Sequence, residues 1–249
     1  MFENVIHFSA HKDIVAQKKL NPVPIKTNIP EWFKKLNHNN QHKTVKGCVP
    51  FLETLTTGYL LKTPQQFLIN HNEFKEDSRV TELQIPDTPF PDKEKKFCLY
   101  NLNYSADGHN PQQIKGSPLA QKNLDVHVQK ILNPWYIKTA PGYSCLFLPP
   151  LNNTDSRFSI IPGIVNTDKF ESRINFPFIV NGDKYPHLKD TIEEGTPYVQ
   201  VIPFKRNSWK MKINSLNDSN INKKLIKFGF LWKLIHSYKT IVWEKISWK

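Results

Sequence analysis

The chain has 249 residues, and its 34 Lys and Arg against 22 Asp and Glu give a formal net charge of +12, which favours polyanionic partners. The three cysteines, Cys48, Cys98 and Cys145, lie far apart without a CxxC pair, which excludes a disulfide framework and a cysteine zinc site. No stretch approaches about 18 apolar residues and the N-terminus lacks a signal-peptide pattern, so we expect a cytoplasmic protein without membrane contact.

Residues 1–46 are expected to form a proline-rich N-terminal arm. Within this arm, NPVPIKTNIPEWFKKL (21–36) is predicted to run extended and to end in a short helix, because Pro30 suits a first helical turn. A second short helix is predicted over 49–58, where Gly58 would end it.

Residues 47–214 have the composition of a β domain. The 19 prolines and nine glycines of the chain separate short segments that are rich in β-branched and aromatic residues. This pattern predicts a mainly β fold. The predicted strands, one of which precedes the domain, are 4–10, 58–63, 65–70, 80–85, 135–140, 143–149, 158–165, 174–180, 198–204 and 208–214.

Residues 215–249 are predicted to form a basic amphipathic helix. Asp218 and Ser219 are typical N-cap residues, and Gly229 interrupts the pattern. We expect the apolar face to pack on the β domain or between subunits, although such a helix also suits an anionic membrane or a partner protein. The apolar positions are Leu225, Phe228, Leu231, Ile235, Tyr238, Val242 and Ile246.

Several segments stand in an order that carries a family resemblance. They are Pro141-Gly142, GIVNTDKF (163–170), the strand at 174–180, and Glu194-Gly195 leading into YVQVI (198–202). Over about residues 134–206 this order resembles the β-clip fold of deoxyuridine triphosphatases and deoxycytidine triphosphate deaminases. The resemblance implies a β-clip domain in which Gly163 opens a tight hairpin, with glycine where the backbone crowds its partner.

In those triphosphatases the hairpin aspartate activates water, a tyrosine lies under the deoxyribose, and magnesium is gathered by the triphosphate. Asn166 stands where the aspartate would be, and an amide cannot act as a general base. Asp168 is therefore the candidate catalytic residue, and Phe170 replaces the tyrosine. The phosphate-gripping Arg-Ser-Ser segment has no counterpart in LPPLNNTDS. The candidate ligand-binding residues are Asn166, Phe170, Gln200, Lys205 and Arg206.

The first functional hypothesis is a nucleotide- or small-anion-binding relative of these enzymes, with a deoxynucleotide as ligand and Mg²⁺ if it hydrolyses nucleotides. Because the family builds its sites between subunits, the resemblance also implies a homotrimer. The chain further resembles a group of marine phage proteins that share IPEW, NPW, PGYS and GTP. The second hypothesis is a non-enzymatic phage structural or interaction protein, in the host cytoplasm or the virion, that assembles through its C-terminal helix.

Two further hypotheses rest on residue types alone. His109 and His127, with Asp107 or Asp125, could form a cupin-like metal site. The other hypothesis is a nucleic-acid surface, because bases stack on aromatic rings while cations follow the phosphates. No GxSxG elbow or phosphate-binding glycine loop is present. The residues of the nucleic-acid surface would be Trp135, Tyr143, Phe147, Trp209, Lys205 and Arg206.

Overall fold

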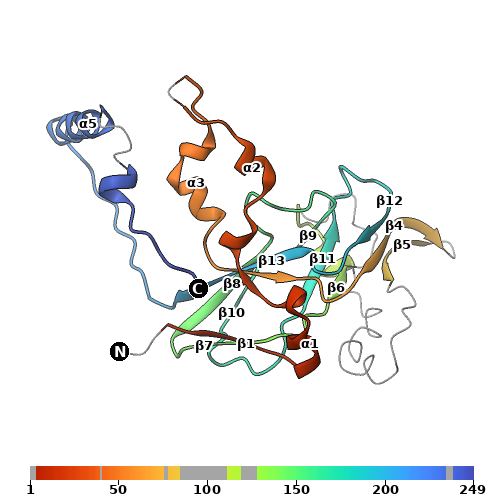
Figure 1. The fold of residues 1–249 in the computed structure, drawn as a ribbon. Coiled ribbons are helices and arrows are strands. Elements are labelled where there is room, and N and C mark those ends of the chain that lie inside the picture. The colour runs from red at the N-terminus through yellow and green to blue at the C-terminus, as the bar shows by residue number, and fades with distance from the viewer. Residues whose placement is uncertain (1–3, 40, 76–77, 85–110, 119–127, 234–237) are drawn as a thin grey trace.

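The computed structural model describes residues 4–39, 41–75, 78–84, 111–118, 128–233 and 238–249. The protein is mainly β, as the sequence predicts, with antiparallel sheets around one core and short helices at the periphery (Figure 1). No helix in the described ranges is both long enough and apolar enough to span a bilayer.

The largest sheet has five strands and joins distant parts of the chain. Its central strand β13 pairs with β8 on one side and with β3 on the other, and β10 and β2 form the two edges. The β-branched side chains of Val199 and Val201 in β13 are buried, which makes this strand part of the core. In spatial order the strands are β10 (Gly163–Val165), β8 (Tyr143–Leu148), β13 (Pro197–Lys205), β3 (Tyr59–Lys62) and β2 (Val23–Pro24).

Three smaller antiparallel sheets complete the β body. Two of them have three strands each, and the third is a pair formed by the first strand of the chain and a strand from its middle. In spatial order they are β6 (Gln129–Ile131), β11 (Phe176–Val180) and β9 (Phe158–Ile160); β12 (Leu188–Ile192), β4 (Phe67–Lys75) and β5 (Ser78–Gln84); and β1 (Ile6–Ser9) with β7 (Tyr136–Thr139).

The helices lie outside the sheets. In Figure 1, α2 and α3 lie above the β body, whereas α5 stands apart from it at the left. The α-helices are α1 (Lys12–Ala16), α2 (Glu31–Lys35), α3 (Val49–Thr54) and α5 (Asp218–Lys233); the 3₁₀ helices are η1 (Lys18–Leu20), η2 (Ile25–Asn28), η3 (Val45–Gly47) and η4 (Pro111–Ile114); and η6 (Tyr238–Val242) is a π-helical turn.

Aromatic side chains from different sheets meet in the core. The ring centroids of Phe147 in β8 and Phe176 in β11 are 5.5 Å apart, and Phe176 makes an edge contact with Tyr198 of β13 at 5.7 Å. The N-terminal segment also contributes, because Ile14 and Leu20 are almost completely buried. The first part of the N-terminal arm therefore packs on the β body.

Most predicted elements are found within one or two residues of their expected ends. The short helices expected in 21–36 and 49–58 are α2 and α3. The missed strands are β2, β6 and β12, which are short or polar. In β12, for example, Lys189 and Asp190 are exposed, so the apolar content that signals a strand is low.

The predicted strand over 208–214 is wrong. The segment belongs to no strand, and all its side chains are exposed. Its alternation of apolar residues with lysine is typical of a strand, but a strand also needs a partner, and none lies beside it in the described part of the chain.

The predicted hairpin over 163–170 is also wrong. β10 pairs with β8, and a turn in which Lys169 and Phe170 donate to the Asn166 carbonyl (2.9 Å each) leads the chain towards β11 in another sheet. Gly163 is not crowded either, since a Cβ built on it would have no atom within 4 Å.

The basic helix is shorter than predicted. α5 confirms a helix that begins at Asp218, but residues 243–249 are not helical. Leu225 is exposed rather than packed on the β body. The C-terminal residues instead return to the body, where the chain ends close to the large sheet (Figure 1).

Substitution of Gly58 by Ala should destabilise the fold. Gly58 has a φ of +83°, and an added Cβ would lie 2.2 Å from the Val201 carbonyl oxygen. A left-handed conformation alone costs an L-residue about 1–2 kcal/mol, so we expect the free energy of unfolding to fall by more than about 2 kcal/mol. Chemical denaturation measures this. Gly163→Ala is the matched control, and its free energy of unfolding should change by less than about 0.5 kcal/mol. Equal losses in both variants would contradict the conclusion that Gly58, and not Gly163, is crowded by its neighbours.

Candidate functional site

An ion pair at the end of β13 fixes the turn that carries the candidate catalytic residue. Arg206 donates from Nη1 to Asp168 Oδ1 (2.7 Å) and from Nη2 to Asp168 Oδ2, an arrangement that suits the planar guanidinium. The backbone N–H of Gly142 donates to Asp168 Oδ2 (2.9 Å). The Asp168 side chain is only 5% exposed, whereas that of Arg206 is 30% exposed, so the carboxylate lies on the inner side of the pair.

The same arginine links the turn to β8. Arg206 Nη1 also donates to the Tyr143 carbonyl (2.7 Å) and to Ser144 Oγ (3.0 Å). The Ser144 hydroxyl in turn donates to Asn166 Oδ1 (2.8 Å). The structure therefore brings together Asn166, Asp168 and Arg206, three of the residues predicted for the site, in one hydrogen-bonded network.

Within this network Asp168 anchors the turn. Hydrogen bonds from the Arg206 guanidinium, and then from the Gly142 N–H, hold the pKa of Asp168 well below its usual range, so the carboxylate is ionised at neutral pH. Both of its oxygens already accept hydrogen bonds, and so acidic a group is a weak general base. The catalytic role predicted for Asp168 would require the ion pair to open.

Two other predicted ligand-binding residues are accessible beside the turn. Phe170 follows it and is 41% exposed. Lys205 is exposed at the end of β13, opposite Tyr143 of β8. An aromatic ring and a cation thus lie on the surface next to residues of the Arg206 network.

Gln200 uses its amide inside the fold. The side chain is fully buried. Its Nε2 donates to the carbonyls of Thr54 and Thr57 (3.3 and 2.7 Å), and its Oε1 accepts from the Leu151 N–H (2.8 Å). Gln200 therefore joins the end of α3 to the large sheet, and its position in the core separates it from the other predicted ligand-binding residues.

The cupin-like hypothesis concerns residues outside the described ranges. His109, His127, Asp107 and Asp125 all lie there. Among the residues that the structure describes, no group of three or more His, Cys, Asp or Glu is placed to hold a metal ion.

The residues proposed for a nucleic-acid surface do not form one surface. Trp135 and Phe147 are buried in the core, whereas Trp209 is 91% exposed in the segment after β13. Arg206 is engaged with Asp168. The sequence cannot separate core from surface aromatics in a β protein, because both occur in the same apolar patterns.

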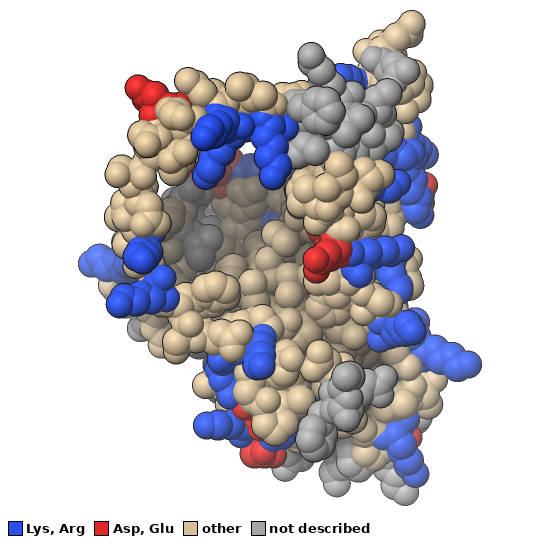
Figure 2. Space-filling view, turned by 90° about the vertical axis from the view of Figure 1, so that its left-hand side faces the viewer, with Lys and Arg blue, Asp and Glu red and all other residues tan. Residues whose placement is uncertain are grey.

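Among the described residues, those of the C-terminal arm, residues 207–249, are the most exposed. Of its described side chains, only Trp243 and Trp248 are even half-buried. The arm contains nine lysines and two acidic residues. Figure 2 shows the face that carries it, where Lys and Arg side chains surround a hollow. A basic arm with exposed apolar side chains, part of it helical, is therefore presented to solvent.

The far end of the arm is held on the β body by two tryptophans. Trp243 Nε1 donates to Glu53 Oε1 of α3 (2.8 Å). The ring of Trp248 meets the ring of Tyr59 in β3 edge-on, with centroids 5.8 Å apart. The Tyr59 hydroxyl donates to the Lys249 carbonyl over 3.3 Å, a long hydrogen bond.

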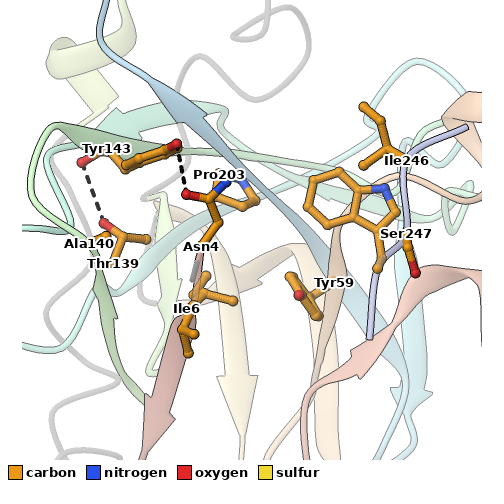
Figure 3. A pocket seen from close by; sticks show the side chains of 11 residues that line it. Asn4, Ile6, Tyr59, Thr139, Ala140, Tyr143, Pro203, Ile246 and Ser247 are labelled. Atoms are coloured by element: carbon orange, nitrogen blue, oxygen red, sulfur yellow. Dashed lines mark hydrogen bonds between the residues drawn. The ribbon is translucent and has the colours of Figure 1, made fainter. Parts of the chain in front are cut away.

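This tail forms one wall of a pocket of about 200 Å³ at the end of the β body. Figure 3 shows Ile6, Tyr59 and Pro203 around the same space, beside Asn4, whose Oδ1 accepts from the Tyr143 hydroxyl (3.0 Å). Sequence reasoning missed this pocket, since its residues come from both ends of the chain and share no motif. The lining residues are Asn4, Val5, Ile6, Tyr59, Thr139, Ala140, Tyr143, Pro203, Ile246, Ser247 and Trp248.

Comparisons with known proteins give no relative: no family model, no curated protein and no solved structure matches the chain.

Substitution of Asp168 by Asn should lower the denaturation midpoint at neutral pH, because it removes the charge that Arg206 binds. A depressed folded-state pKa stabilises the protein fully above the ordinary carboxyl pKa of about 4, and this stabilisation is lost as the pH falls. The difference in midpoint from wild type should therefore be greatest above about pH 5 and shrink below about pH 4. Urea denaturation followed by circular dichroism across this range measures it.

Glu171→Gln is the control for this experiment, because Glu171 pairs with Lys138 at the exposed surface. Its midpoint should differ little from wild type at any pH. A difference between Asp168→Asn and wild type that does not change with pH would contradict the assigned ion pair.

Proposed function

We propose that the protein is a non-enzymatic assembly protein whose β body presents the C-terminal arm to a neighbouring protein subunit. The segment 208–214 carries this proposal, because its Trp209, Met211 and Ile213 are 91, 83 and 86% exposed. If a neighbouring subunit covers these side chains, each Å² of apolar surface removed from water stabilises the complex by about 25 cal/mol. A contiguous exposed apolar group of this kind marks an interaction site.

The spacing of the segment fits strand addition to a sheet. Trp209, Met211 and Ile213 alternate with Lys210 and Lys212. In an extended strand the three apolar side chains would lie on one face and the two lysines on the other. An edge strand of the neighbour would then supply backbone hydrogen bonds, and its apolar face would cover the three side chains.

Nucleic acid and lipid fit this segment less well. Met211 and Ile213 are not aromatic and cannot provide stacking platforms for bases. An extended segment in a bilayer would leave its backbone N–H and C=O groups without partners. A protein edge strand supplies both an apolar surface and backbone hydrogen bonds.

The neighbour that we propose is a second copy of the chain. β10 is an edge of the five-stranded sheet, and its Ile164 is well exposed. Among the described strands β10 pairs only with β8. An edge of this kind and a strand-like arm on one chain permit head-to-tail association that closes into a ring. The β-clip resemblance favours three subunits, and we retain both the β-clip relationship and the homotrimer as parts of this proposal.

Replacement of Trp209, Met211 and Ile213 together by Ser should weaken self-association, because the apolar side chains that the neighbour covers are lost. We expect wild type to sediment as an oligomer and the triple variant mainly as a monomer at equal concentration. Sedimentation velocity over a concentration series measures this, with circular dichroism to check folding.

The matched control is the double variant Lys210→Ser, Lys212→Ser, which changes the same segment but keeps its apolar side chains. It should remain oligomeric. A wild-type chain that is monomeric at every concentration, or a triple variant that associates as wild type does, would rule out the proposal.

Nucleotide or small-anion binding is a second candidate. It is favoured by the accessibility of Phe170 and Lys205 beside the turn. A ring could stack on Phe170 while Lys205 meets a phosphate. Because Asp168 is paired with Arg206, we propose that this site binds the nucleotide without hydrolysing it. Mg²⁺ would then be bound by the phosphates of the ligand.

A thermal-shift screen with deoxynucleoside triphosphates and Mg²⁺ tests this second candidate. One of them should raise the Tm by about 3 °C at a concentration about tenfold above its Kd, and Phe170→Ala should abolish the shift. Trp32→Ala, which changes an exposed ring on α2, should keep it. No shift with wild type, or the same shift in both variants, would exclude this site while leaving the assembly proposal untouched.

A further inference from the structure

The pocket beneath the C-terminal tail belongs to neither proposed function. It lies between the β1–β7 pair and the strands β3, β8 and β13 of the large sheet. Residues 246–248 of the tail form its remaining wall. Small-molecule sites are concave and mostly apolar, with a few polar groups that fix the ligand's orientation. The chemistry of the lining can therefore be used to identify the class of ligand.

The size and walls of the pocket select a small flat molecule. Its volume of about 200 Å³ is below the range of about 300–1,000 Å³ that drug-sized ligands occupy. Tyr59, Tyr143 and Trp248 contribute aromatic rings, and Ile6 and Pro203 contribute aliphatic surface. Aromatic walls favour a planar ring that stacks or makes edge contacts.

The ligand should be uncharged, because no Asp, Glu, Lys, Arg or His lines the pocket and an ion without a partner is costly to bury. Hydrogen-bond donors are present. Asn4 accepts from Tyr143 through Oδ1, so its Nδ2 can donate to a ligand. Burial raises the pKa of Tyr59, so its hydroxyl remains a donor at neutral pH.

We infer that this pocket binds an uncharged, planar, one- or two-ring aromatic molecule that carries a hydrogen-bond acceptor. The ring lies between Tyr59 and Trp248 on one side and Ile6 and Pro203 on the other. The acceptor takes a hydrogen bond from the Asn4 amide or from the Tyr59 hydroxyl, whose present bond to the Lys249 carbonyl is long at 3.3 Å.

The test is titration of the full-length chain with uracil, indole and thymidine, by isothermal titration calorimetry and ligand-observed NMR. At least one of these probes should bind saturably. Trp248→Ala should weaken binding by about tenfold, the effect of losing one aromatic contact. Ile6→Phe, which fills the pocket without removing a wall, should abolish binding.

Trp32→Ala is the matched control, because it removes an equally large ring that is 46% exposed and does not line the pocket. Its affinity should stay within about twofold of wild type. The inference is overturned if no probe binds wild type saturably, or if Trp248→Ala and Ile6→Phe bind as wild type does. Trp32 lies in α2 and not in the arm, so this control leaves the apolar segment 208–214 unchanged. A loss of binding in the Trp248 and Ile6 variants alone is then separate from a loss of assembly.

Discussion

Arg206 sets the geometry on which both candidate sites depend. Its guanidinium binds Asp168 with two nitrogens and the Tyr143 carbonyl with one, and its backbone N–H donates to the Gly142 carbonyl (2.9 Å). These bonds join the turn after β10, the turn before β8 and the end of β13. Since the C-terminal arm begins at the next residue, this arginine also fixes the point at which the arm leaves the body.

Local patterns in the sequence predict elements well where burial and periodicity coincide. β8, β11 and β13 are rich in aliphatic and aromatic residues, most of which are buried or half-buried. The sequence predicts all three strands. The segment 208–214 has a similar local pattern but no partner strand, because pairing depends on distant residues that local periodicity does not contain. β12 shows the reverse case, since its pairing with β4 makes a strand of a polar segment.

The candidate site, too, depends on contacts between residues that are far apart in the sequence. The resemblance places Asn166, Asp168 and Arg206 in one region, but a turn aspartate has the same sequence signature whether it is free or bound to an arginine 38 residues away. That pairing decides whether the carboxylate can accept a proton. The pocket is still less predictable, because Asn4 and Trp248 come from opposite ends of the chain.

The tail that closes the pocket is also the second anchor of the arm, which couples the two sites. The arm is fixed at Arg206 and again at Trp243 and Trp248. The hydrogen bond of Trp243 and the ring contact of Trp248 each contribute only about 0.5–1.5 kcal/mol, and they must offset the entropy of closing a long loop. The tail is therefore a low-stability element. Because Trp248 also lines the pocket, a ligand that contacts its ring stabilises the tail in the position that the structure shows.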